Sequence, residues 1–397
     1  MNNIIINILE EEFIMSLSVG ILGIGNCGGQ IAALGKSTKN IPGMVINSSE
    51  RDIDAVKSIG SIDAFILGDG RGAGLNRTIG KNYVKRNFKS LLENEAYKKF
   101  IDDIDYIFVV NSTGGGTGSS FGPILTDVLN KYYRSKGVEK NFINVGILPA
   151  INNSIGHQRN TLEYLKEMVD LGLSYMLFDN NTLGDATNDI IFEKINSEVV
   201  DAITILRGDY SRMSAVEMLD EMDMHRLIMT PGMIFINNLH GIYTEKMKGD
   251  ATIEDLLIDN IGKNNFMVAP DRDKVIQKAA YICNISEDLR SQFDTHFPKM
   301  KEMYGEPLEF LENYSINEDD DERANYCIYM MFGLSLPDNR LKNIITRIKD
   351  AEEALKKTKT SSLLDSALSL VSDYGDKNTE NSKSEDEFDL DDIMSKY

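Results

Sequence analysis

Cysteine is scarce in this chain of 397 residues, which contains only three. So low a content in so long a chain excludes a disulfide framework and indicates a reducing compartment. Cys27, Cys283 and Cys327 also lack the spacing of metal ligands, so we expect small buried side chains rather than a metal site.

Long apolar runs are missing as well. No segment approaches the roughly 18 uninterrupted apolar residues of a transmembrane helix. Residues 4–9 are mostly apolar, but acids follow them without a small-residue cleavage site, so we do not expect a signal peptide. The sequence predicts a cytoplasmic protein with an N-terminal extension over 1–16, in which Met15 offers an alternative start.

Basic residues are in the minority. The 42 Lys and Arg against 62 Asp and Glu give a net charge of −20. So acidic a body repels a phosphate backbone, which argues against direct binding of nucleic acid. We expect basic partners, or a DNA-binding protein as intermediary.

The first half of the chain alternates short β-branched runs with helical patterns. Strands are predicted at 18–22, 44–47, 64–67, 106–110, 142–148 and 175–178, and helices near 28–37, 50–58, 78–100, 120–135 and 157–172. This alternation predicts an α/β fold with a parallel sheet covered on both faces. Ligands of such sheets bind at the carboxyl ends of the strands, where the glycine- and asparagine-rich loops of this sequence fall.

The second half is organised differently. Periodic apolar residues predict a central core helix over 187–209, and mixed signals predict a smaller α+β second domain over 231–337. Residues 338–375 predict a long C-terminal helix of about 55 Å. The acidic segment 376–397 predicts a disordered tail. Within it, Phe388–Met394 suits a motif that folds onto a basic partner, and it suits a merely solubilising tail equally.

The most informative segment is Asn111–Ser120, which lies between a predicted strand and a predicted helix. Its four glycines remove the Cβ atoms that would hold a ligand away from the backbone. Successive N–H groups and the helix N-terminus behind them form a cradle for a polyanion. No lysine ends the loop, so it is not a Walker-type P-loop. We predict phosphate binding by backbone dipoles, with hydroxyl donors from Thr117, Ser119 and Ser120.

Two further glycine loops also follow predicted strands. Gly23–Gly29 fits the pattern G-x-G-x-x-G, which alone is weak and supports a nicotinamide dehydrogenase as the main rival. A dehydrogenase would need an Asp or Glu at the end of the second strand to bind the ribose, but that strand ends at Asn47. A dehydrogenase would also leave Asn111–Ser120 without a role. Gly68–Asn76 is the third loop, and its Arg71 either reaches phosphate or is merely solvated. Several glycine loops on one sheet predict a nucleotide di- or triphosphate gripped from two sides.

The contiguous Gly-Gly-Gly-Thr-Gly-Ser of 114–119 resembles the signature of the tubulin and FtsZ superfamily of GTPases, and the resemblance extends over roughly 17–340. It implies a tubulin/FtsZ-like GTP-binding domain over 17–186. It also implies GTP or GDP as ligand, with Mg²⁺ held mainly by phosphates and water rather than by direct protein ligands. Residues 72–76 are similar to the γ-phosphate-sensing loop, and Asn180 and Asn196 match the guanine-contacting asparagines. The implied nucleotide-binding residues are Gly25, Asn26, Cys27, Gly28, Asn47, Gly72, Ala73, Gly74, Asn76, Gly114, Gly115, Gly116, Thr117, Gly118, Ser119, Asn153, Asn180 and Asn196.

One loop departs from the superfamily pattern. Where FtsZ proteins have Glu-Gly-Arg-Arg-Arg, this chain has Ile155-Gly-His-Gln-Arg159, so the sugar-contacting acid is missing. Asn152, Asn153 or Ser154 are the remaining candidates for ribose contacts. We expect His157 to be a surface or capping residue rather than a catalyst.

Hydrolysis requires an oriented water molecule. Asp220 and Asp223, in the predicted co-catalytic loop and helix of 210–230, match the catalytic acids of the superfamily's Asn-x-Asp-x-x-Asp loop, although Met218 replaces the asparagine. Capping charges at a helix start are the alternative interpretation. A core helix of about 30 Å separates these acids from their own chain's nucleotide. They can therefore act only on the next subunit of a head-to-tail stack, and such heterologous contacts generate filaments.

The layout resembles the TubZ family more than a division FtsZ. TubZ proteins are plasmid- or phage-encoded tubulin homologues that move DNA through a DNA-bound adaptor held by the C-terminal tail. The resemblance thus implies a filament-forming GTPase whose partners are itself and an adaptor, without membrane or direct nucleic-acid contact. A phage-spindle tubulin of the PhuZ type or a divergent FtsZ-like filament is the close alternative. A nicotinamide dehydrogenase and a non-hydrolysing nucleotide-binding scaffold represent other classes.

Overall fold

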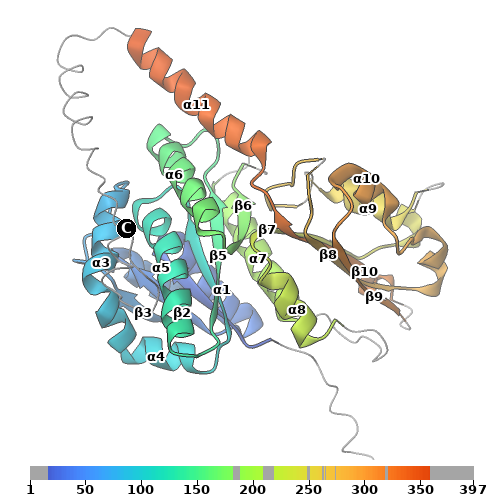
Figure 1. Ribbon diagram of the computed structural model, residues 1–397, viewed down its shortest axis with the longest axis horizontal. Coiled ribbons are helices and arrows are strands. Elements are labelled where there is room, and N and C mark those ends of the chain that lie inside the picture. The colour runs from blue at the N-terminus through green and yellow to red at the C-terminus, as the bar shows by residue number, and fades with distance from the viewer. Residues whose placement is uncertain are drawn as a thin grey trace, which may run out of the picture.

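The computed structural model describes residues 17–181, 188–208, 219–247, 251–261, 263, 265–272, 274–317 and 321–357. The predicted N-terminal extension, the predicted acidic tail and Met218 lie outside these residues. The described chain forms a ten-stranded sheet with helices packed against both of its faces (Figure 1).

The strands are β1 (Val19–Ile24), β2 (Gly43–Asn47), β3 (Asp63–Ile66), β4 (Tyr106–Ser112), β5 (Asn141–Leu148), β6 (Ser174–Asp179), β7 (Gly232–His240), β8 (Lys278–Ile285), β9 (Glu309–Ile316) and β10 (Tyr326–Leu334). The helices are α1 (Gly25–Lys39), α2 (Glu50–Ile59), α3 (Arg77–Glu93), α4 (Glu95–Asp102), α5 (Gly116–Ser135), α6 (Ile155–Leu171), α7 (Asn188–Arg207), α8 (Glu221–Ile228), α9 (Ile253–Asn260), α10 (Pro298–Tyr304) and α11 (Asp338–Lys357).

The strand order is β3-β2-β1-β4-β5-β6-β7-β10-β8-β9. Neighbouring strands from β3 through to β7 run parallel, whereas β10 pairs antiparallel with both β7 and β8. The register places Ile24 beside Ile46 and Asn111, and Leu148 beside Asp179. The carboxyl ends of β1, β2, β4, β5 and β6 therefore meet at one edge of the sheet.

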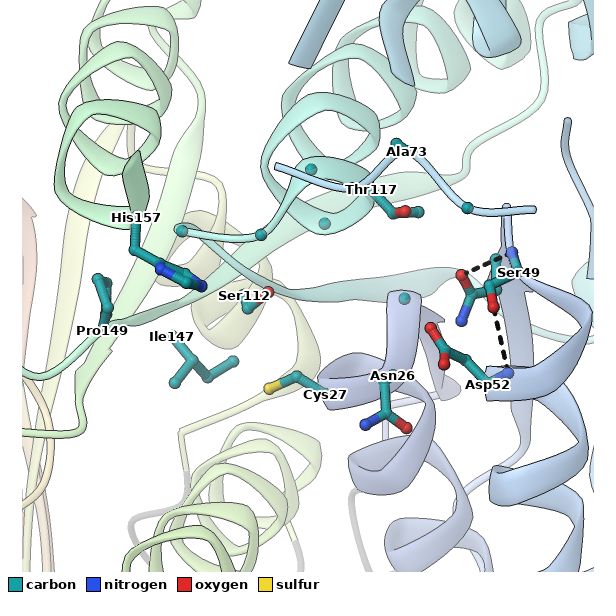
Figure 2. A pocket seen from close by; sticks show the side chains of 18 of the residues that line it. Asn26, Cys27, Ser49, Asp52, Ala73, Ser112, Thr117, Ile147, Pro149 and His157 are labelled. Carbon is teal, nitrogen blue, oxygen red and sulfur yellow. Dashed lines mark hydrogen bonds between the residues drawn. The ribbon is translucent and has the colours of Figure 1, made fainter. Parts of the chain in front are cut away.

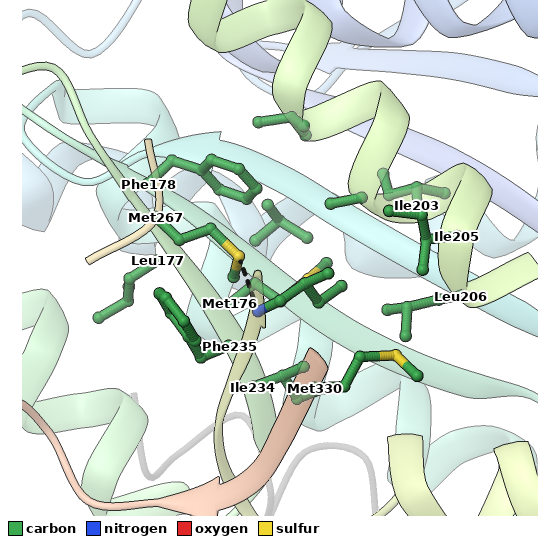
Figure 3. Close-up of a cluster of buried hydrophobic side chains, with 14 of the residues drawn as sticks. Met176, Leu177, Phe178, Ile203, Ile205, Leu206, Ile234, Phe235, Met267 and Met330 are labelled. Carbon is green, nitrogen blue, oxygen red and sulfur yellow. Dashed lines mark hydrogen bonds between the residues drawn. The ribbon is translucent and has the colours of Figure 1, made fainter. Parts of the chain in front are cut away.

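The core follows from the alternation of side chains along buried parallel strands. Within β1, Val19 and Ile21 point into a cluster shared with α1 and α7, whereas Leu22 and Ile24 point into a cluster shared with α3, α4 and α5. The first cluster continues past α7 into the antiparallel half, where Phe178, Phe235, Leu206 and Met330 gather around the junction of β6, β7 and β10 (Figure 3). Both halves of the molecule thus share one buried interior.

The predicted fold class is confirmed: an α/β parallel sheet, a core helix at α7 and a mixed second half. Two helix boundaries differ from the prediction. Asn94 divides the predicted helix of 78–100 into α3 and α4, because its side chain caps α4 by accepting a hydrogen bond from the Tyr97 N–H at 3.0 Å. Helix α5 begins at Gly116 instead of residue 120, so the second half of the glycine loop is the first turn of a helix.

The C-terminal helix α11 is described as far as Lys357, and its predicted continuation lies outside the described residues. It runs outward along α6 (Figure 1), and its inward side chains Ile344 and Ile348 are buried in the core. Among the helices that the structure describes, none combines the length and apolarity needed to cross a membrane.

Candidate functional site

A pocket of about 560 Å³ opens at the carboxyl edge of the parallel strands. Its walls come from the β1–α1 turn, the end of β2 with the start of α2, the loop before α3, the β4–α5 turn, the β5–α6 loop and the first turns of α7. Figure 2 shows side chains from these elements other than α7, among them Asn26, Asp52 and His157, around one space. The volume lies within the roughly 300–1,000 Å³ of small-molecule sites.

The floor of the pocket is the β4–α5 turn. A Cβ at Gly116 would overlap the carbonyl oxygen of Gly74 and lie 2.8 Å from its carbonyl carbon, and one at Gly118 would lie 2.6 Å from the Ser112 carbonyl oxygen. These two glycines let the turn fold tightly beneath the loop that carries Gly74. Gly114 and Gly115 line the pocket itself, so their backbone is open to a ligand.

Two helices, α1 and α5, begin at the pocket. Their N-cap residues are Ile24 and Gly115, neither of which has a polar side chain that could cap the helix. Neither described helix carries an acid in its first turn. Free N–H groups and the positive ends of two helix dipoles therefore converge on one space, which favours a polyanion.

The loop before α3 lies against the rim of the pocket. Gly72 and Gly74 have φ values of +86° and +55°, which glycine adopts without strain, and the Gly72 N–H donates to the Ser48 carbonyl at 2.7 Å. Ser48 in turn shares a hydrogen bond of 2.7 Å with the Thr117 hydroxyl. The three loops are thus linked to one another as well as to the sheet.

Amide and aromatic side chains also line the pocket, with Asn47 at the end of β2 and Asn180 just beyond β6, on opposite sides of β1, β4 and β5. Within the described structure, Asn180 Oδ1 and Asn47 Nδ2 are buried polar atoms without a hydrogen-bond partner, and both residues line the pocket. Buried polar atoms are rarely left unpaired, so these two are poised to bind a ligand. Phe192, in the first turns of α7, lines the pocket too and is 46% exposed, so it offers a flat apolar surface.

Charged side chains at the pocket are few. Asp52, on α2, is the only carboxylate among the described lining residues. Arg71 also lines the pocket, but its guanidinium binds Asp69 at 2.6 Å and is 85% exposed. Burial raises the pKa of the Cys27 thiol to about 12, so this lining cysteine is protonated at neutral pH.

Asp220 and Asp223 lie at the other end of the sheet. The ring of Tyr106, the first residue of β4, contacts His225 on α8, with a hydrogen bond of 2.8 Å from the hydroxyl to Nδ1. Ser112, the last residue of β4, lines the pocket, so the strand separates the two regions by about 20 Å. The acids of this chain therefore do not share its pocket.

The acids have local roles as well. Asp220 is the N-cap of α8 and accepts a hydrogen bond from the Asp223 N–H at 2.8 Å. The Asp223 carboxylate pairs with Arg226 at 3.2 Å, and Arg226 also pairs with Glu309 on β9. The predicted alternative of a capping charge is thus present at Asp220, while Asp223 is held at the surface by Arg226.

A family model for the GTPase domain of the tubulin/FtsZ family matches residues 18–188. Residues 18–188 belong to the tubulin/FtsZ family. The tubulin-like protein CetZ of Pyrococcus abyssi is 30% identical over 195 residues, which are 47% of this chain and 51% of that protein. The chain thus spans about half the length of the curated relatives it matches.

Solved tubulin-like structures share the fold over most of the chain. The TubZ of Clostridium botulinum phage c-st has a TM-score of 0.66 at 17% identity, covering 86% of this chain and all of that one. CetZ2 of Haloferax volcanii, solved as a GTPγS-bound protofilament, has a TM-score of 0.66 at 15% identity, covering 87% of this chain and all of that one. The predicted membership of the tubulin/FtsZ superfamily is confirmed, while sequence similarity leads to CetZ proteins and structural similarity to both TubZ and CetZ.

Most of the nucleotide-binding residues predicted from the tubulin/FtsZ resemblance line one pocket. They are Gly25, Asn26, Cys27, Asn47, Gly72, Ala73, Gly74, Gly114, Gly115, Gly116, Thr117, Gly118, Asn153 and Asn180. The structure brings these residues together from six separate loops and helix starts. Their individual contacts to a nucleotide remain predictions.

Four predicted residues are not among the described lining residues of the pocket. Gly28 packs against β4, where a Cβ would lie 2.9 Å from the Val110 carbonyl carbon. Asn76 caps α3 by accepting from the Ile79 N–H at 3.1 Å, and the Ser119 hydroxyl donates to the Gly115 carbonyl. Asn196 lies on α7 one turn beyond Phe192, the last residue of that helix to line the pocket.

Sequence reasoning missed several lining residues. Ser49, Asp52 and Phe192 line the pocket although no glycine motif contains them, and Ser112 lines it although only its neighbours in the glycine loop were predicted. The one sequence signal for Phe192 as a lining residue was its position four residues before Asn196, which places both side chains on the same face of a helix. His157 was expected to be a capping or surface residue, and it lines the pocket while bonding the Ser154 hydroxyl at 2.7 Å through Nδ1.

Proposed function

We propose that this chain binds GTP in the pocket at the sheet edge, assembles head to tail, and hydrolyses the GTP with Asp220 and Asp223 of the next subunit. The observation that carries the proposal is the separation of two incomplete halves, a polyanion pocket and an acid-bearing helix, at opposite ends of one sheet. No single chain completes a hydrolytic site from parts so placed. A heterologous contact between copies does, and it propagates as a filament.

The pocket suggests a definite orientation for the nucleotide. The glycine turns at Gly25, Gly72–Gly74 and Gly114–Gly118 would hold the phosphates, because their N–H groups and two helix N-termini converge there. The base would lie at the opposite end, where Asn180 offers an acceptor to the guanine N–H groups and Phe192 offers a stacking surface.

The donor set at the phosphate end also fits a hydrated Mg²⁺ ion. Asp52, Ser49 and Thr117 present oxygen atoms beside the turns, so they would meet waters of an ion bound to the phosphates. Such an ion would neutralise phosphate charge during hydrolysis. The described residues contain no cluster of three His, Cys, Asp or Glu that would hold a metal alone.

Each subunit would contribute to two hydrolytic sites, one through its pocket and one through its helix α8. Its pocket positions GTP with the γ-phosphate at the rim, and its α8 presents Asp223 to the GTP of the subunit below. Asp223 would accept a proton from the attacking water, while Asp220 maintains the start of α8 through its cap. Within this scheme we assign 17–186 to the nucleotide domain, 187–209 to the core helix, 210–230 to the co-catalytic segment, 231–337 to the second domain, 338–375 to the C-terminal helix and 376–397 to the tail.

A mixing experiment tests the proposal. Gly116→Ala disrupts the pocket, because the added Cβ collides with the Gly74 carbonyl, but it keeps both acids. Asp223→Ala keeps the pocket but removes one acid. Each variant alone should hydrolyse GTP far more slowly than the wild type, whereas a mixture should recover activity, because the Asp223→Ala pocket then meets the intact α8 of Gly116→Ala. Adding the double variant Gly116→Ala/Asp223→Ala in place of Gly116→Ala is the control and should restore nothing.

Two outcomes contradict the proposal. One is turnover by isolated Asp223→Ala at the wild-type rate, because the acid then plays no part. The other is a wild-type rate strictly proportional to protein concentration, since a site completed between copies requires a threshold for assembly.

The narrower role that we propose for the filament is the movement of plasmid or phage DNA through a DNA-bound adaptor, as in the TubZ proteins that the sequence resembles. The net charge of −20 supports an indirect link to DNA rather than direct binding. Deletion of 376–397 tests this role. Loss of adaptor-linked DNA capture with intact filaments supports it, and loss of assembly favours a tail that joins neighbouring subunits.

A further inference from the structure

The first turn of the C-terminal helix α11 reaches the base end of the pocket from behind. Arg340 Nε donates to Asp179 Oδ2 at 2.6 Å, and one Nη donates to Asp179 Oδ1 at 3.0 Å and to the Pro149 carbonyl at 2.8 Å. Asp179 is the last residue of β6, and Pro149 directly follows β5. One guanidinium therefore joins the ends of two neighbouring strands.

The two loops that Arg340 joins form the base end of the pocket. Pro149, Ala150 and Asn153 line it from the first loop, and Asn180 lines it from the second. The loops also hold each other, because the Asn181 side chain accepts from the Ile151 N–H at 3.2 Å and the Asn180 N–H donates to the Leu148 carbonyl at 3.2 Å. Arg340 lies behind this assembly and is absent from the described lining.

The ion pair is buried on both sides. Arg340 is 8% exposed and Asp179 is 9% exposed. Burial raises the pKa of the Asp179 carboxyl, and the Arg340 charge together with the Asn181 N–H opposes that rise. Loss of Arg340 would leave a buried carboxylate short of partners next to Asn180, and the loop would shift to solvate it.

Helix α11 is itself firmly anchored at this end. Asp271 accepts hydrogen bonds from the Asp338 N–H and from the Asn339 side chain. Ile344, one turn beyond Arg340, is fully buried in the core. The guanidinium is therefore held in place from the helix side as well as from the strand side.

We propose that Arg340 is a positioning residue for nucleotide recognition, through which the C-terminal helix fixes the Asn180 loop and so sets both the preference for guanine and the rate of nucleotide release. The proposal rests on GTP binding in the pocket. It follows from the fork geometry, since only a planar guanidinium bridges both carboxylate oxygens and the Pro149 carbonyl at once.

Substitution of Arg340 tests the proposal in the full-length protein. Arg340→Met removes the bridge, and Arg340→Lys keeps the positive charge but loses the fork. We expect release of a fluorescent GTP or GDP analogue to be about tenfold faster in Arg340→Met, with an intermediate effect in Arg340→Lys. The ratio of the GTP to ATP dissociation constants should move toward one, because the altered loop recognises the base and leaves the phosphate turns intact.

The chain offers a matched control on the same helix. Glu352 of α11 pairs with Arg159 of α6 at 2.7 Å, and both side chains are about half exposed, at 44% and 54%. Glu352→Gln removes this surface pair about 18 Å further along α11 and should leave nucleotide release and base preference unchanged.

The outcomes separate the possible failures. A merely structural role for Arg340 would lower the melting temperature without changing the GTP to ATP ratio, and that result in folded Arg340→Lys overturns the inference. If Arg340→Met does not fold, Arg340→Lys alone decides. A wild-type protein that binds GTP and ATP equally well contradicts the proposed function itself rather than the role of Arg340.

Discussion

The two ends of the parallel sheet differ in how complete they are. At the carboxyl end, turns from six places enclose a pocket, and unpaired amide atoms of Asn47 and Asn180 face into it. At the amino end, Asp220 and Asp223 lie at the start of an α8 helix that the Tyr106–His225 hydrogen bond holds beside β4. One end is built to hold a ligand, and the other presents acids without one.

The difference shows how a hydrolytic site can be divided between copies of one chain. The pocket end contributes positive dipoles and hydrogen-bond donors, and the acid end contributes carboxylates. Complementary charge on opposite ends also favours head-to-tail contact over contact between like ends. Substitutions that change one end of the sheet and leave the other intact therefore separate the contributions of the two ends.

The largest effect is expected at the tightest glycine. Gly116→Ala places a Cβ onto the carbonyl of Gly74, so the floor and the rim of the pocket must move apart. We expect GTP affinity, measured by titration, to fall about 100-fold or more. Gly60→Ala is the control, because no atom lies within 4 Å of a Cβ there and its φ is −170°. Equal affinity in the two variants would contradict the close approach of the two loops.

The acid end is changed by Asp223→Ala. Steady-state GTP turnover should fall about 100-fold, while binding of GTP to the monomer stays unchanged, because the acid serves a neighbouring pocket. Glu287→Ala is the control, since Glu287 also forms a surface ion pair with an arginine three residues later, at 3.2 Å. If the Asp223→Ala monomer bound GTP more weakly than the wild type, this acid would belong to its own chain's site, and a site divided between two copies would be contradicted.

A smaller effect is expected at the base end of the pocket. Phe192→Ala removes the proposed stacking surface, so GTP and GDP should both bind about tenfold more weakly in a titration. Ile190→Ala is matched, because Ile190 lies on the same helix with the same 46% exposure but is absent from the described lining. Equal affinities of the two variants would show that Phe192 does not contact the base.

Much of the pocket end was predictable from sequence because parallel strands place their carboxyl ends together. Apolar runs identified β1, β3 and β4, and the glycine-rich turns after them then had to meet at one edge. The start of α5 was not predictable in this way. Gly116 and Gly118 have poor helix propensity, and the sequence does not reveal that a Cβ at either position would collide with the backbone of Gly74 or Ser112.

Other features could not be inferred because they depend on contacts between distant segments. Asp52 and Phe192 are ordinary helix residues in sequence, and only the assembled sheet brings them to the pocket. Arg340 follows the antiparallel half of the chain, and nothing in its neighbourhood indicates a bond to Asp179, which lies 161 residues earlier. Asn196 lies one helical turn beyond Phe192 on α7, and this distance along the helix leaves it outside the described lining of the pocket.

The smallest effect concerns α7, the helix that connects the two ends. Burial, with repulsion from Asp201, raises the pKa of Glu198 on this helix from 4.5 to about 7, and Asp201 also pairs with Lys39 at 3.1 Å. The folded protein thus binds this proton more tightly than the unfolded chain does. Its contribution to stability is complete below about pH 4.5 and is lost as the pH rises through 7.

Glu198→Gln should therefore match the wild type near pH 4.5 and exceed its free energy of unfolding at pH 8 by on the order of 1 kcal/mol. Urea unfolding of both proteins between pH 4.5 and pH 8 measures the difference in their free energies of unfolding. Contributions from groups that titrate equally in the two proteins cancel in this difference. Asp201→Asn should reduce the same pH dependence only in part, because burial is the larger cause of the shift. A constant difference across this range would mean that the pKa of Glu198 is the same in the folded and the unfolded protein, and that burial on α7 does not favour its protonated form.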